Sequence, residues 1–83
     1  MTALPANVAL QHGACLELTE QVPDVTYRVL WPNAVRSASG TLCREPSGAY
    51  TLFPGAGGVH MDCEDWDEAV QVVEHLARLM VGP

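Results

Sequence analysis

The C-terminal end of the chain carries a long helical period, and this feature constrains the fold more than any other. At about 100° per residue, the apolar side chains of residues 66–80 cover an arc of roughly 200°. Polar and charged side chains fill the remaining arc, so the pattern predicts an amphipathic helix. Asp65 is a good N-cap, and Glu68 forms a capping-box-like pair with it. Gly82 and Pro83 favour an end to the helix.

Before this helix, apolar and polar residues alternate in short segments that are separated by turn residues. The clearest is 25–31, where Val25, Tyr27, Val29 and Trp31 fall on one face. Alternation of apolar and polar residues is typical of half-buried strands. The predicted strands lie near 14–20, 25–31, 41–45, 49–53 and 59–63, with a short strand at 7–11 as an option and a weak, bulge-prone stretch at 36–40.

These elements predict an α+β fold: an antiparallel β-meander of four to five strands with one C-terminal amphipathic helix packed on one face. Residues 1–83 form a single domain, because two cores need a longer chain. The helix residues expected to face the sheet are Trp66, Val70, Val73, Leu76, Ala77 and Met80. The apolar arc is wider than one sheet requires. Its edge at 72–79 is therefore either covered by the N-terminal segment or left exposed as a homodimer seam or partner contact.

The charge balance excludes several functions. Ten Asp and Glu against four Arg and no Lys give a net charge of −6. Nucleic-acid binding and polybasic membrane binding both need cationic side chains that this chain lacks. No apolar run approaches the ~20 residues of a membrane span, and the N-terminus lacks a signal-peptide pattern. The odd number of cysteines (Cys15, Cys43 and Cys63) fits a reducing compartment, so we expect a cytoplasmic protein.

A cluster of carboxylates is the most informative local feature. Five lie within residues 62–68 and a sixth follows: Asp62, Glu64, Asp65, Asp67, Glu68 and Glu74. One interpretation is helix-start chemistry, because acids near a helix N-terminus stabilise its free N–H groups. The other is an acidic face that docks on a basic groove and imitates nucleic-acid phosphate. Helix-start chemistry explains Asp65, Asp67 and Glu68 well, but it explains Asp62 and Glu64 less well, since five like charges repel.

Other candidate sites carry weaker signals. His12 and Cys15, and His60 and Cys63, share the H-x-x-C spacing of a zinc site, but strand alternation separates the second pair. We therefore expect no metal and no cofactor. No serine has a nucleophile motif, and a chain of this size has little room for a pocket of ~300 Å³, so we expect no enzyme. Trp31 and Trp66 are core residues or, alternatively, exposed interface anchors.

Residues 48–55, Gly-Ala-Tyr-Thr-Leu-Phe-Pro-Gly, followed by 65–70, Asp-Trp-Asp-Glu-Ala-Val, resemble the partial RNase-H-like domain of HicB-type antitoxins. The resemblance covers residues 39–80. It implies a domain that neutralises a small toxin by protein–protein binding. The added strand at 25–31 and the missing DNA-binding module depart from that family.

The whole chain is also similar to the phage- and plasmid-borne anti-CRISPR proteins in size, acidity and α+β architecture. That likeness implies a stoichiometric inhibitor of a CRISPR effector. The first hypothesis is thus a non-catalytic inhibitor that docks its acidic face on a basic nucleic-acid-binding site. A HicB-like antitoxin domain is the alternative, and a zinc-stabilised interaction module is the third hypothesis.

Overall fold

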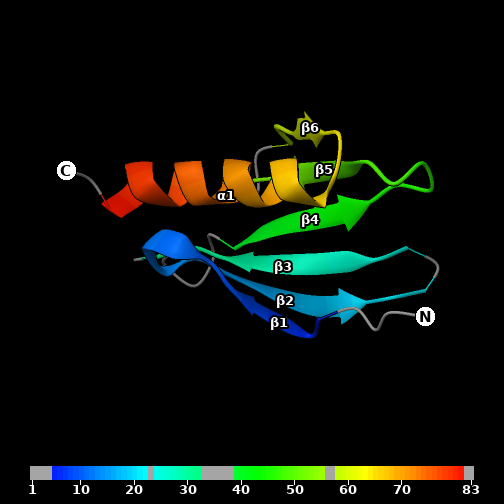
Figure 1. Cartoon of the computed structure of the whole chain (residues 1–83), viewed down its shortest axis with the longest axis horizontal. Coiled ribbons are helices and arrows are strands. Elements are labelled where there is room, and N and C mark those ends of the chain that lie inside the picture. Colours follow the sequence, from blue (N-terminus) through cyan, green and yellow to red (C-terminus); the bar gives the residue numbers. More distant parts are fainter. Residues whose placement is uncertain (1–4, 23, 33–38, 56–57, 82–83) are drawn as a thin grey trace.

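The computed structural model of the chain describes residues 5–22, 24–32, 39–55 and 58–81. In these stretches six antiparallel strands form one open sheet, with an α-helix on one of its faces (Figure 1). The elements are β1 (Asn7–Ala9), a 3-10 turn η1 (Gln11–Gly13), β2 (Cys15–Glu20), β3 (Thr26–Leu30), β4 (Gly40–Arg44), β5 (Tyr50–Phe53), β6 (Met61–Cys63) and α1 (Trp66–Val81). The predicted class, an antiparallel meander with one C-terminal helix, is confirmed.

The strands lie in the sheet in the order in which they occur in the chain. The five predicted strands and the helix are all present, each within about two residues of its expected bounds. The sheet has one strand more than expected, because β1 pairs with β2 through Val8 opposite Leu16. The weak stretch at 36–40 falls mostly outside the described residues, as do Gly82 and Pro83.

The core lies between the sheet and α1. Alternate residues of the strands point to the helix, as the period-two pattern predicts. The side chains with no exposed surface include Leu16, Tyr27, Val29, Leu42, Leu52, Ala69, Val73 and Ala77. The three helix residues in this set are spaced by four, so they form one stripe along α1. Two of them are alanines, whose small side chains let the helix approach the sheet closely.

Aromatic rings close the core near the start of the helix. The ring of Trp66 lies 5.3 Å from that of Tyr27 and 5.6 Å from that of Tyr50, centroid to centroid, in tilted and edge-on geometries that favour aromatic pairs. The Tyr27 hydroxyl donates a hydrogen bond of 3.1 Å to the carbonyl oxygen of Pro5. Burial raises the pKa of both tyrosines. These contacts tie the N-terminal segment to the same core as the helix.

The other end of the sheet is closed by Trp31, which is only 6% exposed. Its indole N–H donates a hydrogen bond of 2.8 Å to the carbonyl oxygen of Pro54. Gly40 makes this approach feasible, since a Cβ atom there would lie 2.7 Å from the Phe53 carbonyl oxygen and 3.2 Å from the Trp31 indole nitrogen. The interpretation of Trp31 as an exposed interface anchor is therefore wrong, and the residue belongs to the core.

The helix is longer than the strands on which it packs. Sixteen helical residues span about 24 Å, whereas a five-residue strand spans about 17 Å. Figure 1 shows the last turn of α1 projecting beyond the strands. Met80 is 46% exposed for this reason, so the expectation that it faces the sheet is wrong. Leu79 and Val81 of the same turn are also exposed.

The helix edge at 72–79 is covered in part. The turn η1 packs against α1, and the backbone N–H of Gln11 donates a hydrogen bond of 2.8 Å to the Glu74 carboxylate. Val72 and Leu76 pack against the core, while Leu79 stays 64% exposed. The N-terminal segment thus contacts this edge, which was one of the two expectations. The large apolar side chain of the edge that stays exposed, Leu79, lies in the last turn.

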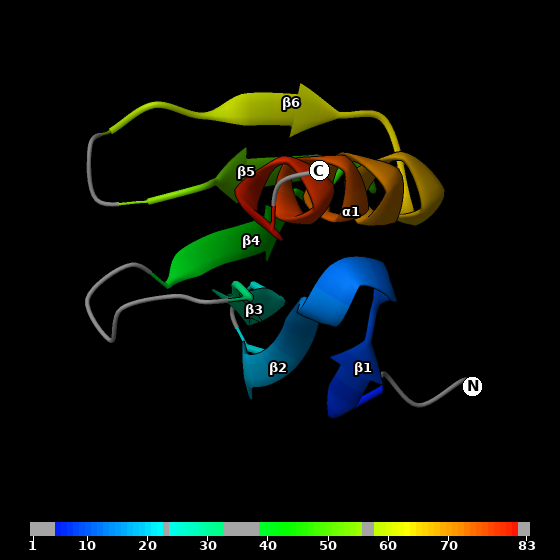
Figure 2. The ribbon, with the colours of Figure 1, turned by 90° about the vertical axis from the view of Figure 1, so that its left-hand side faces the viewer.

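Figure 2 shows that α1 and η1 lie on the same side of the curved sheet. We call that side the covered face. On the other side, the open face, no described helix or strand packs against the sheet. The functional question therefore concerns the open face and the loops around it.

Candidate functional site: a hollow on the open face

Strand alternation places one row of polar side chains across the open face. Thr26 of β3 is opposite Cys43 of β4, Cys43 is opposite Thr51 of β5, and Thr51 is opposite Asp62 of β6. Their sequence neighbours Tyr27, Leu42, Leu52 and Cys63 all point into the core. The row follows directly from the period of two, because residues opposite each other in an antiparallel sheet share a face.

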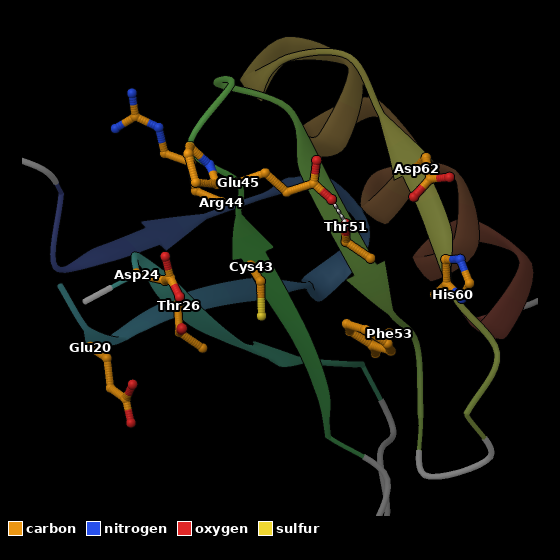
Figure 3. Close-up of a pocket in the computed structure, with 11 residues that line it drawn as sticks. Glu20, Asp24, Thr26, Cys43, Arg44, Glu45, Thr51, Phe53, His60 and Asp62 are labelled. Atoms are coloured by element: carbon orange, nitrogen blue, oxygen red, sulfur yellow. Dashed lines mark hydrogen bonds between the residues drawn. The ribbon is translucent and has the colours of Figure 1, made fainter. Parts of the chain in front are cut away.

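This row forms part of a hollow of about 480 Å³ (Figure 3). The residues that line it are Glu20, Asp24, Thr26, Cys43, Arg44, Glu45, Pro46, Thr51, Phe53, His60 and Asp62. Its volume exceeds the limit of ~300 Å³ expected for so small a domain. The expectation failed because it reasoned from the small size of the chain, whereas this hollow is open and lies on a sheet face that no described element covers.

Two contacts order one side of the hollow. The Thr51 hydroxyl donates a hydrogen bond of 2.9 Å to a carboxylate oxygen of Glu45. The rings of Phe53 and His60 lie 5.9 Å apart, centroid to centroid, in a tilted arrangement. Glu45 and Asp62 thus lie on either side of Thr51, with the aromatic pair below them in the view of Figure 3.

The hollow is acidic. Its lining includes four carboxylates (Glu20, Asp24, Glu45 and Asp62) and one arginine, Arg44. Strand alternation puts the Arg44 side chain on the same face of the sheet as Leu42, and its partner on the neighbouring strand is Tyr50. Figure 3 shows the Arg44 guanidinium directed away from the hollow. The electric field in the hollow is therefore set mainly by the carboxylates.

The six acidic residues predicted as a docking face do not share one face. Asp62 lines the hollow on the open face. The other members of the cluster lie just before α1 (Glu64 and Asp65) or within it (Asp67, Glu68 and Glu74). Asp65 accepts a hydrogen bond of 2.8 Å from the Glu68 backbone N–H, which confirms it as the N-cap. Glu68 accepts one of 3.4 Å from the backbone N–H of Glu64, one residue earlier than in a standard capping box.

Glu74 has a structural contact of its own, with Gln11 of η1. Glu64 and Asp67 are exposed, and in the described part of the chain neither side chain accepts a hydrogen bond or pairs with an arginine. The structure therefore separates the cluster into three residues with structural contacts (Asp65, Glu68 and Glu74) and three without (Asp62, Glu64 and Asp67).

The second anchor candidate, Trp66, is half-buried, and its ring packs on the two core tyrosines. It is the first residue of α1, and it lies on the covered face. Its main role is thus to join the helix to the sheet, and it is not among the residues that line the hollow.

The H-x-x-C pairs do not converge. His60 lines the hollow on the open face, whereas Cys63 is buried under the helix. Burial, and then the nearby carboxylates of Glu68, Asp62 and Asp65, raise the pKa of the Cys63 thiol. Among the residues that the structure describes, no three His, Cys, Asp or Glu side chains are grouped so that they could hold a metal ion.

Sequence reasoning missed three of the four carboxylates that line the hollow: Glu20, Asp24 and Glu45. Each lies at a strand end or in an adjoining turn, where a charged residue is ordinary and carries no signal. The alternation in 41–45 places Glu45 on the face of Cys43, which was a usable clue. The cross-strand register that brings Glu45 and Asp62 to the same hollow cannot be read from single strands.

Comparisons with protein-family models, with curated proteins and with solved structures gave no match for this chain. In addition, none of the described helical segments combines the length and the apolar character of a membrane span.

Proposed function

We propose that this protein is a non-catalytic inhibitor that binds another protein, with its acidic surface docked on a basic nucleic-acid-binding site of a macromolecular complex. An anti-CRISPR-like role against a CRISPR effector is the specific form of this proposal. The protein acts in the cytoplasm, where such complexes are found, and it needs neither cofactor nor metal.

One observation supports the proposal above the others. All ten carboxylates lie in the described residues, and five of them are engaged: Glu17, Glu45, Asp65, Glu68 and Glu74. The other five form no hydrogen bond or ion pair with a described residue: Glu20, Asp24, Asp62, Glu64 and Asp67. An excess of charge of one sign destabilises a compact domain by self-repulsion unless charges outside it compensate. A basic partner would provide that compensation.

The physical mechanism is electrostatic steering. A surface with uncompensated carboxylates accelerates association with a cationic groove and makes the rate fall as salt rises. The partner's groove normally holds the phosphates of a nucleic acid, so the bound inhibitor and the nucleic acid exclude each other. Inhibition of this kind is stoichiometric and needs no chemical step.

The test is to titrate the purified protein into a guide-loaded CRISPR effector and measure target cleavage. We expect inhibition to be complete near one equivalent and to weaken with salt. The triple variant Asp62→Asn, Glu64→Gln, Asp67→Asn should lose inhibition while it keeps its melting temperature. Asp65→Ala is the matched control, since it loses a helix cap and retains the three carboxylates. Full inhibition by the triple variant at low salt would contradict the proposal.

The second candidate is a HicB-like antitoxin domain. The order of elements over 40–81, two strands, a further short strand and then a helix, is the order that this resemblance implies. The same binding assay with a small basic toxin, in place of the effector, separates the two candidates. Neutralisation of the toxin without any effect on CRISPR effectors would favour the antitoxin.

A further inference from the structure

The open face of the sheet differs from the covered face in what packs on it and in the side chains that it carries. The covered face is occupied by α1 and η1, and no described element occupies the opposite one. It carries an aromatic ring, a thiol and two threonines between charged groups, namely Phe53, Cys43, Thr26 and Thr51. A sheet face with this composition suits contact with another molecule better than contact with water alone.

The charges on this face indicate what kind of molecule fits. Toward its centre, Glu17 pairs with Arg28, whose nitrogen lies 3.7 Å from the carboxylate, so that part is close to neutral. At the hollow, the carboxylates of Glu45 and Asp62 lie on either side of Thr51, and the guanidinium of Arg44 points away. A cationic group entering the hollow would therefore meet these two carboxylates, and Arg44, the one arginine among the described lining residues, would not compete with it.

The aromatic pair adds a second preference. The Phe53 ring, tilted against His60 at 5.9 Å, belongs to the same hollow as Asp62. Guanidinium groups are planar, stack on aromatic rings and form paired hydrogen bonds with carboxylates. An ammonium group can use the charge, but it does not match both the ring and the carboxylates in the same way. The combination favours arginine over lysine.

We propose that the hollow between Glu45, Phe53 and Asp62 binds an arginine side chain of a basic protein segment, and that this contact anchors the protein on its partner. The inference rests on the proposed function, since it names the recognition element within the docked surface. It places that element on the open face of the sheet rather than at the start of the helix. A second copy of this chain is a poor occupant, because its hollow carries charge of the same sign.

The test uses the ¹⁵N-labelled full chain and the peptide acetyl-Gly-Arg-Gly-Arg-Gly-Arg-Gly-amide at low salt, followed by NMR. We expect the largest amide shifts at residues around the hollow, including Cys43, Thr51, Phe53 and Asp62. The same peptide with citrulline in place of arginine keeps the shape and loses the charge, so it should cause no saturable shift. Shifts confined to the helix start would overturn the inference.

Two double variants make the test quantitative. Glu45→Gln with Asp62→Asn removes two charges from the hollow, and Glu64→Gln with Asp67→Asn removes two charges outside it. Both lower the net negative charge equally, so general attraction falls by the same amount. We expect the first pair to weaken peptide binding about tenfold or more and the second less than about threefold. Phe53→Leu should weaken it by about two- to fivefold.

The outcomes separate this inference from the proposed function. An equal loss of peptide affinity in both double variants would show that the hollow is not the anchor. The proposed function would then still be tested by the effector assay. No saturable peptide binding, or a dimer in solution whose interface maps to the open face, would also overturn the inference. Peptide binding at the hollow with no inhibition of any effector or toxin would instead retain the site and reject the proposed function.

Discussion

The covered face and the open face of this sheet are built from alternate residues of the same strands, yet one is buried and the other is exposed. On the covered face, Tyr27, Leu42 and Leu52 are fully buried under α1. On the open face, their neighbours Thr26, Cys43 and Thr51 line a hollow with an acidic rim. The comparison shows that stability is concentrated on one side of a thin domain. The other side is therefore free to vary its charge without loss of the fold.

The largest effect is expected from a charged side chain placed on the covered face. Val73 lies at the centre of the buried helix stripe and has no exposed surface. Val73→Asp should unfold the domain, because it buries a carboxylate that has no partner. Circular dichroism should show loss of the cooperative melt. A folded, cooperatively melting Val73→Asp protein would show that the helix is not essential to the core.

The next largest loss of stability is expected at alkaline pH. Burial raises the pKa values of Tyr27, Tyr50 and Cys63, which all belong to the core. The folded state binds these protons more tightly than the unfolded chain does. Their contribution to stability is therefore complete below about pH 8 and is lost as pH rises through the pKa values of the folded protein. Urea unfolding at several pH values between 8 and 11 should show a falling midpoint. A midpoint that stays constant to pH 11 would contradict the burial of these groups.

A smaller loss of stability is expected from a change at the end of the sheet where Trp31 is buried. Gly40→Ala would place a Cβ atom 2.7 Å from the Phe53 carbonyl oxygen, so the backbone must shift and the bond from Trp31 to Pro54 must weaken. Overpacking of this kind lowers the free energy of unfolding by about 1–3 kcal/mol. Gly48→Ala is an informative contrast, because a Cβ atom there meets no neighbour and only its positive φ opposes the change. Equal losses in both would argue against close packing at Gly40.

Loss of the helix cap should have a still smaller effect. Asp65→Ala removes the acceptor for the Glu68 backbone N–H and should lower the free energy of unfolding by about 1 kcal/mol. Asp67→Ala, two residues later, removes a carboxylate without such a contact and serves as its control. Thermal denaturation of both variants gives the comparison. If Asp67→Ala destabilises the domain more than Asp65→Ala does, the division of the acids into structural and free residues is wrong.

The fold could be predicted from the sequence because its signals are local. The stripe of α1 and the alternation in 25–31 each depend on one segment, and so does the N-cap at Asp65. Strand β1 was harder, since three residues contain too little alternation, and its position depends on pairing with β2. Met80 was wrongly expected to face the sheet. A helical wheel shows the direction in which each side chain points, but it does not show how far the sheet extends beneath the helix.

The candidate site could be predicted only in part, because it depends on register. Asp62 was identified as an acid that capping does not need, and the structure places it beside Thr51 on the open face. Its partners in the hollow, Glu20, Asp24 and Glu45, come from distant turns and show no shared motif. Sequence proximity instead grouped Asp62 with the acids at the helix start, although its side chain lies on the opposite face from the helix.

If five carboxylates are available to a partner, the fold does not depend on them. The most direct test is the variant that neutralises all five: Glu20→Gln, Asp24→Asn, Asp62→Asn, Glu64→Gln and Asp67→Asn. The free energy of unfolding, measured by urea denaturation at pH 7 and low salt, should be unchanged or higher, since repulsion is relieved. A loss of more than about 1 kcal/mol would show that these carboxylates hold the fold together and are not free for a partner.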